Sequence, residues 1–308
     1  MHQTEPCESD AGAFSKVGSS RFKKIVKKAA FLLVHGASHG AWCFSKLVPY
    51  LERAGHVTAR DLLGHGGRAR HPNAFRRRPS DEEAFAIEPS PIAAVTLADY
   101  VSDVMQTLDA LVGFGGGPVI LLGHSMGGIP ITAVGEAAPK KVLKLNYLTA
   151  YMPASGAPAI AYNRAPEAEG GKIGAAMKAD PARVGALRTD PRSVDPADVA
   201  NLKQAFANDV SEDEWAVAQD LLSSDAPALP FATSVETTRS RWGSIPRVYI
   251  KCRGDLAIMP RTQEKFVELA DEFTPQNRTE VYGLDSSHSR FFSQPEKLAA
   301  IPLKLASK

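Results

Sequence analysis

A serine stands between two glycines in Gly123-His124-Ser125-Met126-Gly127, which fits the pattern G-x-S-x-G. An apolar run, 118–122, precedes it and a helix-compatible stretch follows it. This composition suits a sharp strand-to-helix turn that lifts the Ser125 hydroxyl out of a sheet and puts a helix start, with its free N–H groups, beside it. The pattern predicts Ser125 as a nucleophile and the Met126 amide as one donor to a developing oxyanion.

A second donor is expected from His35-Gly36-Ala37, which follows the first apolar run, 30–34. In a fold built around such a turn, the loop after this strand supplies the other half of the oxyanion hole. We therefore assign the Ala37 amide to that role. His39, two residues further on, is expected to be a buried structural histidine rather than a catalytic one.

The general base must come late in the chain, because the order in this fold is nucleophile, acid, histidine. His288 follows the last predicted strand, whereas His124 is expected to point away from Ser125. The acid should follow the strand 248–250, where Asp255 stands, and it would fix the histidine tautomer. Asp285 is the rival acid, but it is too close to His288 in sequence to approach its ring easily.

The elements that would position these residues are short apolar runs separated by helical patterns. Near-continuous apolar runs are typical of strands buried on both faces of a parallel sheet. Helical spacing appears in 44–51, 101–112, 260–270 and 298–305. The alternation predicts an α/β fold with a mostly parallel, doubly wound sheet. The expected strands are 30–34, 57–60, 118–122, 142–148, 248–250 and 279–282.

Two segments interrupt the alternation. Residues 68–91 are rich in Pro, Arg and Glu without a clear period and predict a long surface excursion near the site. Residues 152–241 predict a mostly helical cap, with helix starts at Asp195-Pro196 and at Ser211. The predicted domains are a tail, 1–21, a core, 22–151 with 242–308, and this cap.

Composition excludes several classes of protein. The 308 residues carry a net charge of only +2, so no global charge favours nucleic acid or a membrane surface. The three cysteines, Cys7, Cys43 and Cys252, are far apart and predict free thiols in a reducing compartment. The polar N-terminus lacks the apolar run of a signal peptide. We expect a cytoplasmic protein without metal or cofactor, and a homodimer is left open.

Taken together, the motifs resemble the plant methylesterase and hydroxynitrile lyase branch of the α/β-hydrolases and the bacterial esterases near it. The resemblance rests on 32–42, on 242–250, on Gly254-Asp255 and on His288-Ser289. It implies the α/β-hydrolase fold, with the cap inserted after the sixth strand of that fold. The lyases carry threonine after the first histidine and lysine after the catalytic one, where this chain has Gly36 and Ser289. These departures argue against cyanohydrin cleavage.

The function that these residues predict is hydrolysis of a carboxylic ester of a moderately hydrophobic small molecule. Ser125, His288 and Asp255 would form the triad and act through an acyl-enzyme. The same triad could instead serve lactone, amide or carbon–carbon bond hydrolysis. A receptor-like protein that binds a small ligand without turnover is the remaining alternative.

Overall fold

The computed structural model describes residues 29–115 and 117–306, so the predicted tail and Cys7 lie outside the described residues. Its main sheet confirms the predicted mostly parallel architecture, because each of the expected apolar runs forms a strand in it. All neighbouring strands are parallel, in the order β2-β1-β3-β4-β7-β8. The strands are β1 (Ala29–Val34), β2 (Gly55–Ala59), β3 (Val119–His124), β4 (Val142–Leu148), β7 (Arg247–Cys252) and β8 (Glu280–Leu284).

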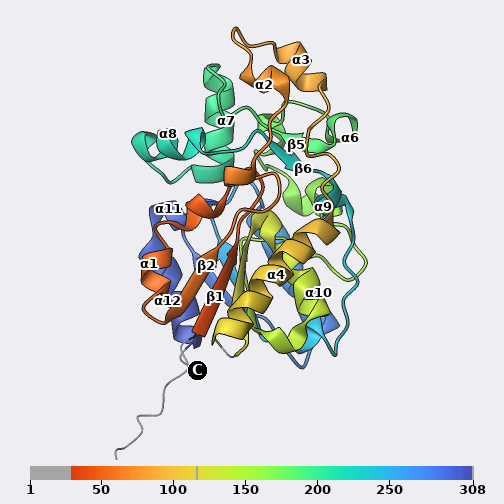
Figure 1. The fold of residues 1–308 in the computed structure, drawn as a ribbon, viewed down its shortest axis with the longest axis vertical. Helices are drawn as coiled ribbons and strands as arrows, with labels where there is room; N and C mark the ends of the chain where they lie inside the picture. Colours follow the sequence, from red (N-terminus) through yellow and green to blue (C-terminus); the bar gives the residue numbers. More distant parts are fainter. Residues whose placement is uncertain (1–28, 116, 307–308) are drawn as a thin grey trace, which may run out of the picture.

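Helices cover both faces of this sheet (Figure 1). Alternate side chains of β1 face opposite ways, since successive residues of a strand point to opposite faces. Phe31 and Leu33 pack with α1 (Val48–Leu51), α11 (Arg290–Ser293) and α12 (Pro295–Ala306). Leu32 and Val34 pack on the other side. That face is covered by α4 (Leu97–Gly115), α5 (Gly128–Ala137) and α10 (Pro260–Phe273).

The helical pattern predicted over 44–51 is only partly realised. The chain there forms a 3₁₀ turn, η1 (Ala41–Phe44), and then the separate short helix α1. Pro49 lies in the first turn of α1. Proline has no N–H and clashes with the preceding turn inside a helix, so one continuous helix through this position is disfavoured.

The excursion, 68–91, contains structure that the sequence did not reveal. After η2 (Gly66–Arg68) it forms two short helices, α2 (Asn73–Arg76) and α3 (Glu82–Ile87). Ala74, Phe75 and Phe85 form a small apolar cluster between them. Helices of one or two turns are too short to show a period, which explains why the pattern looked irregular.

The inserted segment, 152–241, follows β4, which is the fourth strand in chain order among the described residues. Two of its helices begin at the predicted starts. The side chains of Asp195 and Ser211 cap α7 (Pro196–Ala207) and α8 (Glu212–Asp220) by accepting from backbone amides. The segment also contains an antiparallel ribbon of β5 (Ala186–Arg188) and β6 (Asp225–Pro227), which the sequence did not predict.

The remaining elements are short. In the inserted segment they are η5 (Ala159–Arg164), η6 (Pro166–Ala168), η7 (Gly174–Ala176), α6 (Pro181–Val184) and α9 (Leu229–Ala232). In the rest of the chain they are η3 (Ser125–Gly127), η4 (Pro139–Lys141) and η8 (Trp242–Ser244).

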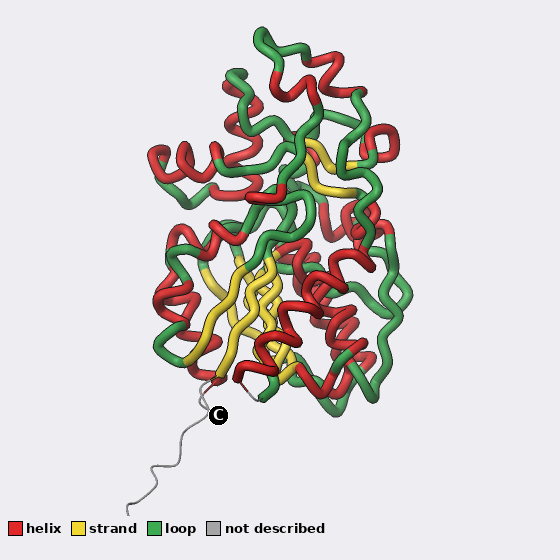
Figure 2. The backbone as a smooth tube through the Cα atoms, viewed as in Figure 1, coloured by secondary structure: helices red, strands yellow, loops and turns green. Residues whose placement is uncertain are grey.

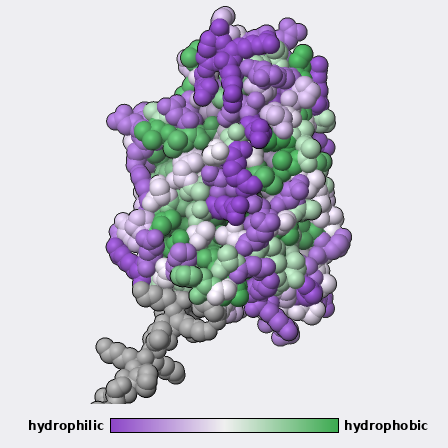
Figure 3. All heavy atoms as spheres, in the orientation of Figure 1, coloured by the Kyte–Doolittle hydropathy of each residue, from purple (hydrophilic) through white to green (hydrophobic). Residues whose placement is uncertain are grey.

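The inserted segment and the excursion lie together above the sheet, over the carboxyl ends of its strands (Figure 1). Figure 2 shows the yellow strands of the main sheet confined to the lower half, with loops and short helices above them. Hydrophilic side chains cover the tip at α2 and α3 (Figure 3). No helix in the described part of the chain is long and apolar enough to cross a membrane.

Candidate active site

Ser125 occupies the turn between β3 and α5. Its backbone has a φ of 53°, a left-handed conformation that is uncommon for a residue with a side chain. The turn is possible only with a glycine at 127, because a Cβ there would stand 2.4 Å from the carbonyl oxygen of Val34. Strain of this kind concentrates at functional sites, where it fixes a side chain in one position. The serine is nearly buried, with 8% of its surface exposed.

The loop after β1 passes directly against this serine. A Cβ at position 36 would stand 2.6 Å from the Cβ of Ser125 and 3.2 Å from its Oγ, so only glycine fits. Ala37, the next residue, lines the same cavity as Ser125. Met126 follows the serine at the start of the helical turn and is buried. The two residues predicted as oxyanion donors therefore both lie beside Ser125.

His35 holds this loop in place. Its Nε2 accepts a hydrogen bond from the Leu62 amide at 3.0 Å, while its Nδ1 lies 2.8 Å from the Gly36 carbonyl oxygen and can donate to it. Burial lowers the pKa of His35 to about 4, because a charged ring would lose its hydration. The ring is therefore neutral near pH 7, which matches one acceptor and one donor nitrogen.

His288 pairs with Asp255. The Nδ1 atom of His288 lies 2.7 Å from Asp255 Oδ2, and both side chains are buried. The other carboxylate oxygen accepts from the amides of Ala257 at 2.7 Å and Ile258 at 2.9 Å. This arrangement leaves Nε2 of His288 as the free nitrogen of the ring, the one that a general base needs.

The rival acid, Asp285, lies elsewhere. It forms a hydrogen-bonded ion pair with Arg253 at 2.7 Å, and its side chain is 87% exposed. The structure thus places His288 against Asp255 and not against Asp285. Asp255 and Asp285 both follow neighbouring parallel strands, β7 and β8. The direction of the side chain, and not the position in the chain order, therefore decides which acid meets His288.

The structure records no direct hydrogen bond between Ser125 Oγ and His288 among the described residues. Phe206 connects their surroundings, because it lines the cavity with Ser125 and stacks on the His288 ring at 6.0 Å between centroids. Hydrogen bonds of this kind are often long without substrate and shorten when substrate binds. The His288 ring therefore contacts a residue of the wall of the cavity into which Ser125 opens.

Three further residues lie around the pair of His288 and Asp255, and the sequence had predicted no role in the site for any of them. Thr149, at the end of β4, donates a hydrogen bond from Oγ1 to Asp255 Oδ2. The His124 ring lies 4.5 Å from the His288 ring, and its Nε2 lies 3.1 Å from the His288 carbonyl oxygen. Ser289 contacts His39. The one signal in the sequence for Thr149 and His124 is their position at the carboxyl ends of the neighbouring strands β4 and β3.

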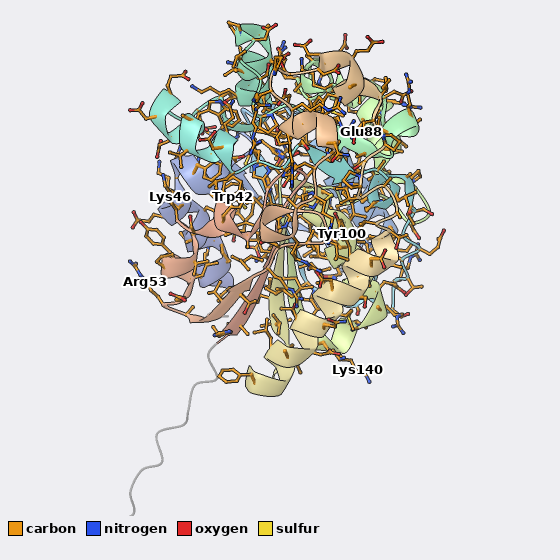
Figure 4. All side chains as sticks on the ribbon, turned by 45° about the horizontal axis from the view of Figure 1, so that its top comes forward. Trp42, Lys46, Arg53, Glu88, Tyr100 and Lys140 are labelled. Carbon is orange, nitrogen blue, oxygen red and sulfur yellow. The ribbon has the colours of Figure 1, made fainter. Side chains whose placement is uncertain are left out.

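His39 is buried, as expected, and bridges two loops of the site. Its Nδ1 lies 2.8 Å from the Ala37 carbonyl oxygen and its Nε2 lies 3.3 Å from Ser289 Oγ. Burial lowers the pKa of His39 to about 3, so the ring is neutral. It also stacks on Trp42, which Figure 4 labels, at 5.8 Å. The histidine therefore ties the loop after β1 to the turn that carries His288.

A cavity of about 40 Å³ opens beside Ser125. Its walls come from the loop after β1, the loop after Asp255 and the inserted segment, and most of the lining residues are apolar. The lining residues are Ala37, Ser38, Ser125, Tyr151, Asn163, Ile173, Met177, Leu187, Thr189, Phe206, Phe231, Ala257 and Ile258. Larger hollows on the surface contain neither Ser125 nor His288.

No metal site accompanies this arrangement in the described residues. Within them, no group of three or more His, Cys, Asp or Glu side chains could hold a metal ion. The clustered histidines His35, His39 and His124 bond to backbone or side-chain partners of the protein instead. The chemistry that the arrangement itself offers is that of a strained serine near a histidine that a carboxylate orients.

Comparison with known proteins extends over nearly the whole chain. Residues 31–301 match the family described as the alpha/beta hydrolase family. Methylesterase 4 from Arabidopsis thaliana is 29% identical, over 91% of this chain and 97% of its own. Salicylic acid-binding protein 2 from Nicotiana tabacum is also 29% identical, over 90% and 97%.

Solved structures show the same likeness. The pyrethroid hydrolase PytH superposes with a TM-score of 0.68 at 25% identity, covering 91% of this chain and 98% of its own. A methylesterase from Arabidopsis gives a TM-score of 0.62 at 25% identity, over 91% and 99%. Esterases and related hydrolases thus share this arrangement of elements.

Proposed function

Because the chain belongs to the alpha/beta hydrolase family, we propose that it cleaves a carboxylic ester of a moderately hydrophobic small molecule through an acyl-enzyme. The observation that carries this proposal is the buried pair of His288 and Asp255, 2.7 Å apart, beside a strained serine. The names of the relatives, methylesterases and a pyrethroid hydrolase, support an ester as the substrate class.

In the proposed reaction, Ser125 Oγ bonds to the ester carbonyl carbon while its proton passes to His288 Nε2. The carbonyl oxygen becomes an oxyanion, which the amides of Ala37 and Met126 would stabilise. Each such donor contributes about 3 kcal/mol to transition-state stability in comparable hydrolases. The carbon–oxygen bond to the alcohol then breaks, and the alcohol leaves with the proton from His288. Water repeats these steps and releases the acid.

Asp255 would act by orienting the ring rather than by taking a proton. Its two oxygens accept five hydrogen bonds, from the side chains of His288, Thr149 and Gln263 and from the amides of Ala257 and Ile258. A carboxylate held this way keeps Nδ1 of His288 protonated and Nε2 free. It also stabilises the imidazolium that forms when Ser125 loses its proton.

The cavity supports a small, largely apolar acid moiety. At about 40 Å³ it has room for few heavy atoms in the arrangement described. We therefore expect esters of short acids to react fastest. We further propose that the inserted segment, 152–241, is the cap of this site, because it supplies Ile173, Met177 and Phe206 to the lining.

The two departures from the lyase pattern support hydrolysis. Gly36 leaves the space next to Ser125 Oγ open, where a threonine Cβ would stand 3.2 Å away. Ser289 supplies no positive charge beside His288 and contacts His39 instead. A cyanide leaving group would find no cation at this position.

Binding without turnover is the second candidate, because one relative bears the name of a salicylic acid-binding protein. The lactone, amide and carbon–carbon alternatives would use the same residues.

The buried free thiols Cys43 and Cys252 support the predicted reducing, cytoplasmic compartment. A homodimer stays a prediction.

The proposal is tested with p-nitrophenyl esters of increasing acyl length, comparing the wild type with Ser125→Ala and His288→Ala. We expect each variant to lose at least about 10³-fold in kcat/KM, since such residues act as a unit. Ser102→Ala, on an exposed position of α4, is the matched serine control and should keep wild-type rates. Retention of most activity in Ser125→Ala would disprove the mechanism. Tight binding of a small ligand with no hydrolysis of any ester would favour the second candidate.

A further inference from the structure

One polar group in the wall of the cavity has no partner in the protein. Thr189 is 2% exposed, and its Oγ1 atom makes no hydrogen bond. Among the described residues that line the cavity, it is the only one with a buried side-chain oxygen or nitrogen left unpaired. Buried polar groups are nearly always paired, because an unpaired one loses its bond to water without replacement. Such a group in a binding cavity indicates a ligand atom as its partner.

The ribbon in the inserted segment fixes where this hydroxyl lies. Leu187 and Thr189 both line the cavity, whereas Arg188 between them contacts the opposite side, as the alternation of a strand requires. The Thr189 amide donates to the Ser224 carbonyl at 2.8 Å, which continues the ladder between β5 and β6. Thr189 is therefore held on the cavity side of the ribbon.

Arg188 prevents the ribbon from turning over. Its guanidinium forms two hydrogen bonds to Asp225, at 2.9 and 2.8 Å, and both side chains are fully buried. It also donates to the carbonyl oxygen of Glu88 at 2.8 Å and to that of Phe85 in the excursion. Rotating the ribbon to hide Thr189 would break this buried pair. The unpaired hydroxyl is thus a stable feature of the cavity wall.

Besides Ser125 and Thr189, the other polar side chains of the wall are Ser38, Asn163 and Tyr151, and the rest of the lining is apolar. Ile173, Met177, Leu187, Phe206 and Phe231 are apolar, and the Tyr151 hydroxyl is bonded to Asn163 at 2.5 Å. A substrate that fits this lining is therefore mostly hydrocarbon, with an oxygen placed to reach Thr189. A hydroxyl can donate to that oxygen, because Thr189 gives its proton to no protein group.

We propose that Thr189 forms a subsite that selects esters whose acid moiety carries an oxygen that accepts a hydrogen bond, such as a keto group. The proposal rests on the ester hydrolysis proposed above and names the substrate class more closely. A site built to bond an oxygen discriminates against the analogue that lacks it, because the site's own polar group is then left unpaired.

The test compares methyl pentanoate with methyl 3-oxopentanoate and methyl 4-oxopentanoate, which place the oxygen at two distances from the ester. We expect the wild type to show a kcat/KM about 3- to 10-fold higher for at least one keto ester, the range that a neutral hydrogen bond supports. Thr189→Val should bring the ratio of keto to plain ester close to one. Thr189→Ser, which keeps the hydroxyl, should retain the preference.

The proposal is overturned if the wild type prefers neither keto ester, or if Thr189→Val keeps the wild-type ratio. A ratio of two substrates is insensitive to partial loss of folded protein, and thermal melts of both variants check folding. Calorimetric titration of the same esters into Ser125→Ala measures the preference without turnover. If no ester is hydrolysed, but Ser125→Ala binds the keto ester more tightly and loses this with Thr189→Val, the subsite stands and only the proposed reaction fails.

Discussion

At the scale of single residues, the site depends on the hydrogen bonds that the Asp255 carboxylate accepts. Asp255 accepts hydrogen bonds on both oxygens, two from the amides of its own loop and three from the side chains of His288, Thr149 and Gln263. All of these partners are donors, so the position suits only an acceptor. Asp285 has one exposed partner, Arg253, and stands outside this arrangement.

Replacing Asp255 with asparagine should therefore be far more damaging than the same change at Asp285. The amide nitrogen of Asp255→Asn would face a donor wherever it turns, so His288 loses its orientation. We expect kcat for a p-nitrophenyl ester to fall about 10³- to 10⁴-fold. Asp285→Asn removes an exposed ion pair and should leave kcat within about twofold, since such pairs contribute little. A larger loss in Asp285→Asn than in Asp255→Asn would identify the other acid.

At the scale of elements, the excursion and the inserted segment are joined by buried polar bonds. Arg188 links the ribbon to the carbonyl oxygens of Phe85 and Glu88, and Figure 4 labels Glu88. Within the excursion, the Glu88 carboxylate accepts from the amides of Asn73 and Ala74 at 2.8 Å. The guanidinium of Arg192 also lies 4.7 Å from the centre of the Phe75 ring. The two segments, far apart in sequence, thus form one layer over the site.

Arg188→Met should destabilise the fold strongly, because it leaves Asp225 buried without its partner. Breaking a buried pair from one side costs about 3–5 kcal/mol of unfolding free energy. Arg253→Met, the matched change in an exposed pair, should cost less than about 1 kcal/mol. Urea unfolding followed by circular dichroism measures both.

The double variant Arg188→Met with Asp225→Leu is the internal control for this comparison. It removes both charges and should recover part of the loss, since apolar replacements of buried pairs are often tolerated. Equal unfolding free energies for Arg188→Met and Arg253→Met would show that the buried pair does not hold the ribbon.

The inserted segment also bonds directly to the loops that carry the proposed site residues. One bond reaches the loop after β1, one the turn after His288, and two the loop around Asp255. These pairs are Ser223 N with Ser38 O, Ser289 N with Phe206 O, Lys172 N with Leu256 O and Asn208 Nδ2 with Gly254 O. The segment therefore positions these loops as well as covering the cavity.

At the scale of the whole molecule, buried neutral histidines link folding to pH. Burial lowers the pKa of His35 to about 4 and of His39 and His65 to about 3, and that of His124 falls well below its usual value. In the unfolded chain these rings have pKa values of about 6.5. Below that pH the unfolded state takes up protons that the folded state cannot accept.

Unfolding free energy should therefore be level above about pH 6.5 and fall as the pH drops from 6.5 towards 4. Each buried histidine contributes a slope of up to about 1.4 kcal/mol per pH unit in this window. His65→Gln removes one buried histidine, so it should lower this slope by up to about 1.4 kcal/mol per pH unit. His56→Gln, at an exposed position, is the control and should leave the slope as it is in the wild type. Urea unfolding at pH 7.5, 6.5 and 5.5 makes the measurement, and a free energy that does not change between 7.5 and 5.5 would contradict it.

The sequence by itself determined which segments form the strands of the main sheet. It also determined the strand-to-helix turn at Ser125 and the glycines that this turn requires. These features depend on local chemistry: apolar runs mark buried strands, and a left-handed turn in close contact with Val34 needs glycine at 127. The same local rules predicted where α7 and α8 begin, because a side chain that caps a helix stands next to it in sequence. They also placed Ser125, Ala37 and His288 as candidates.

Only the tertiary structure decided which partners these candidates meet. Asp255 and Asp285 both follow strands in the sheet, and the direction of their side chains separates them. Thr149 lies far in sequence from Asp255, and His124 lies far from His288, so no spacing could reveal these contacts. Thr189 is likewise distant in sequence from Ser125, with which it lines the cavity. The physical reason is that strand identity follows from neighbours along the chain, whereas hydrogen-bond partners at strand ends depend on how distant segments pack.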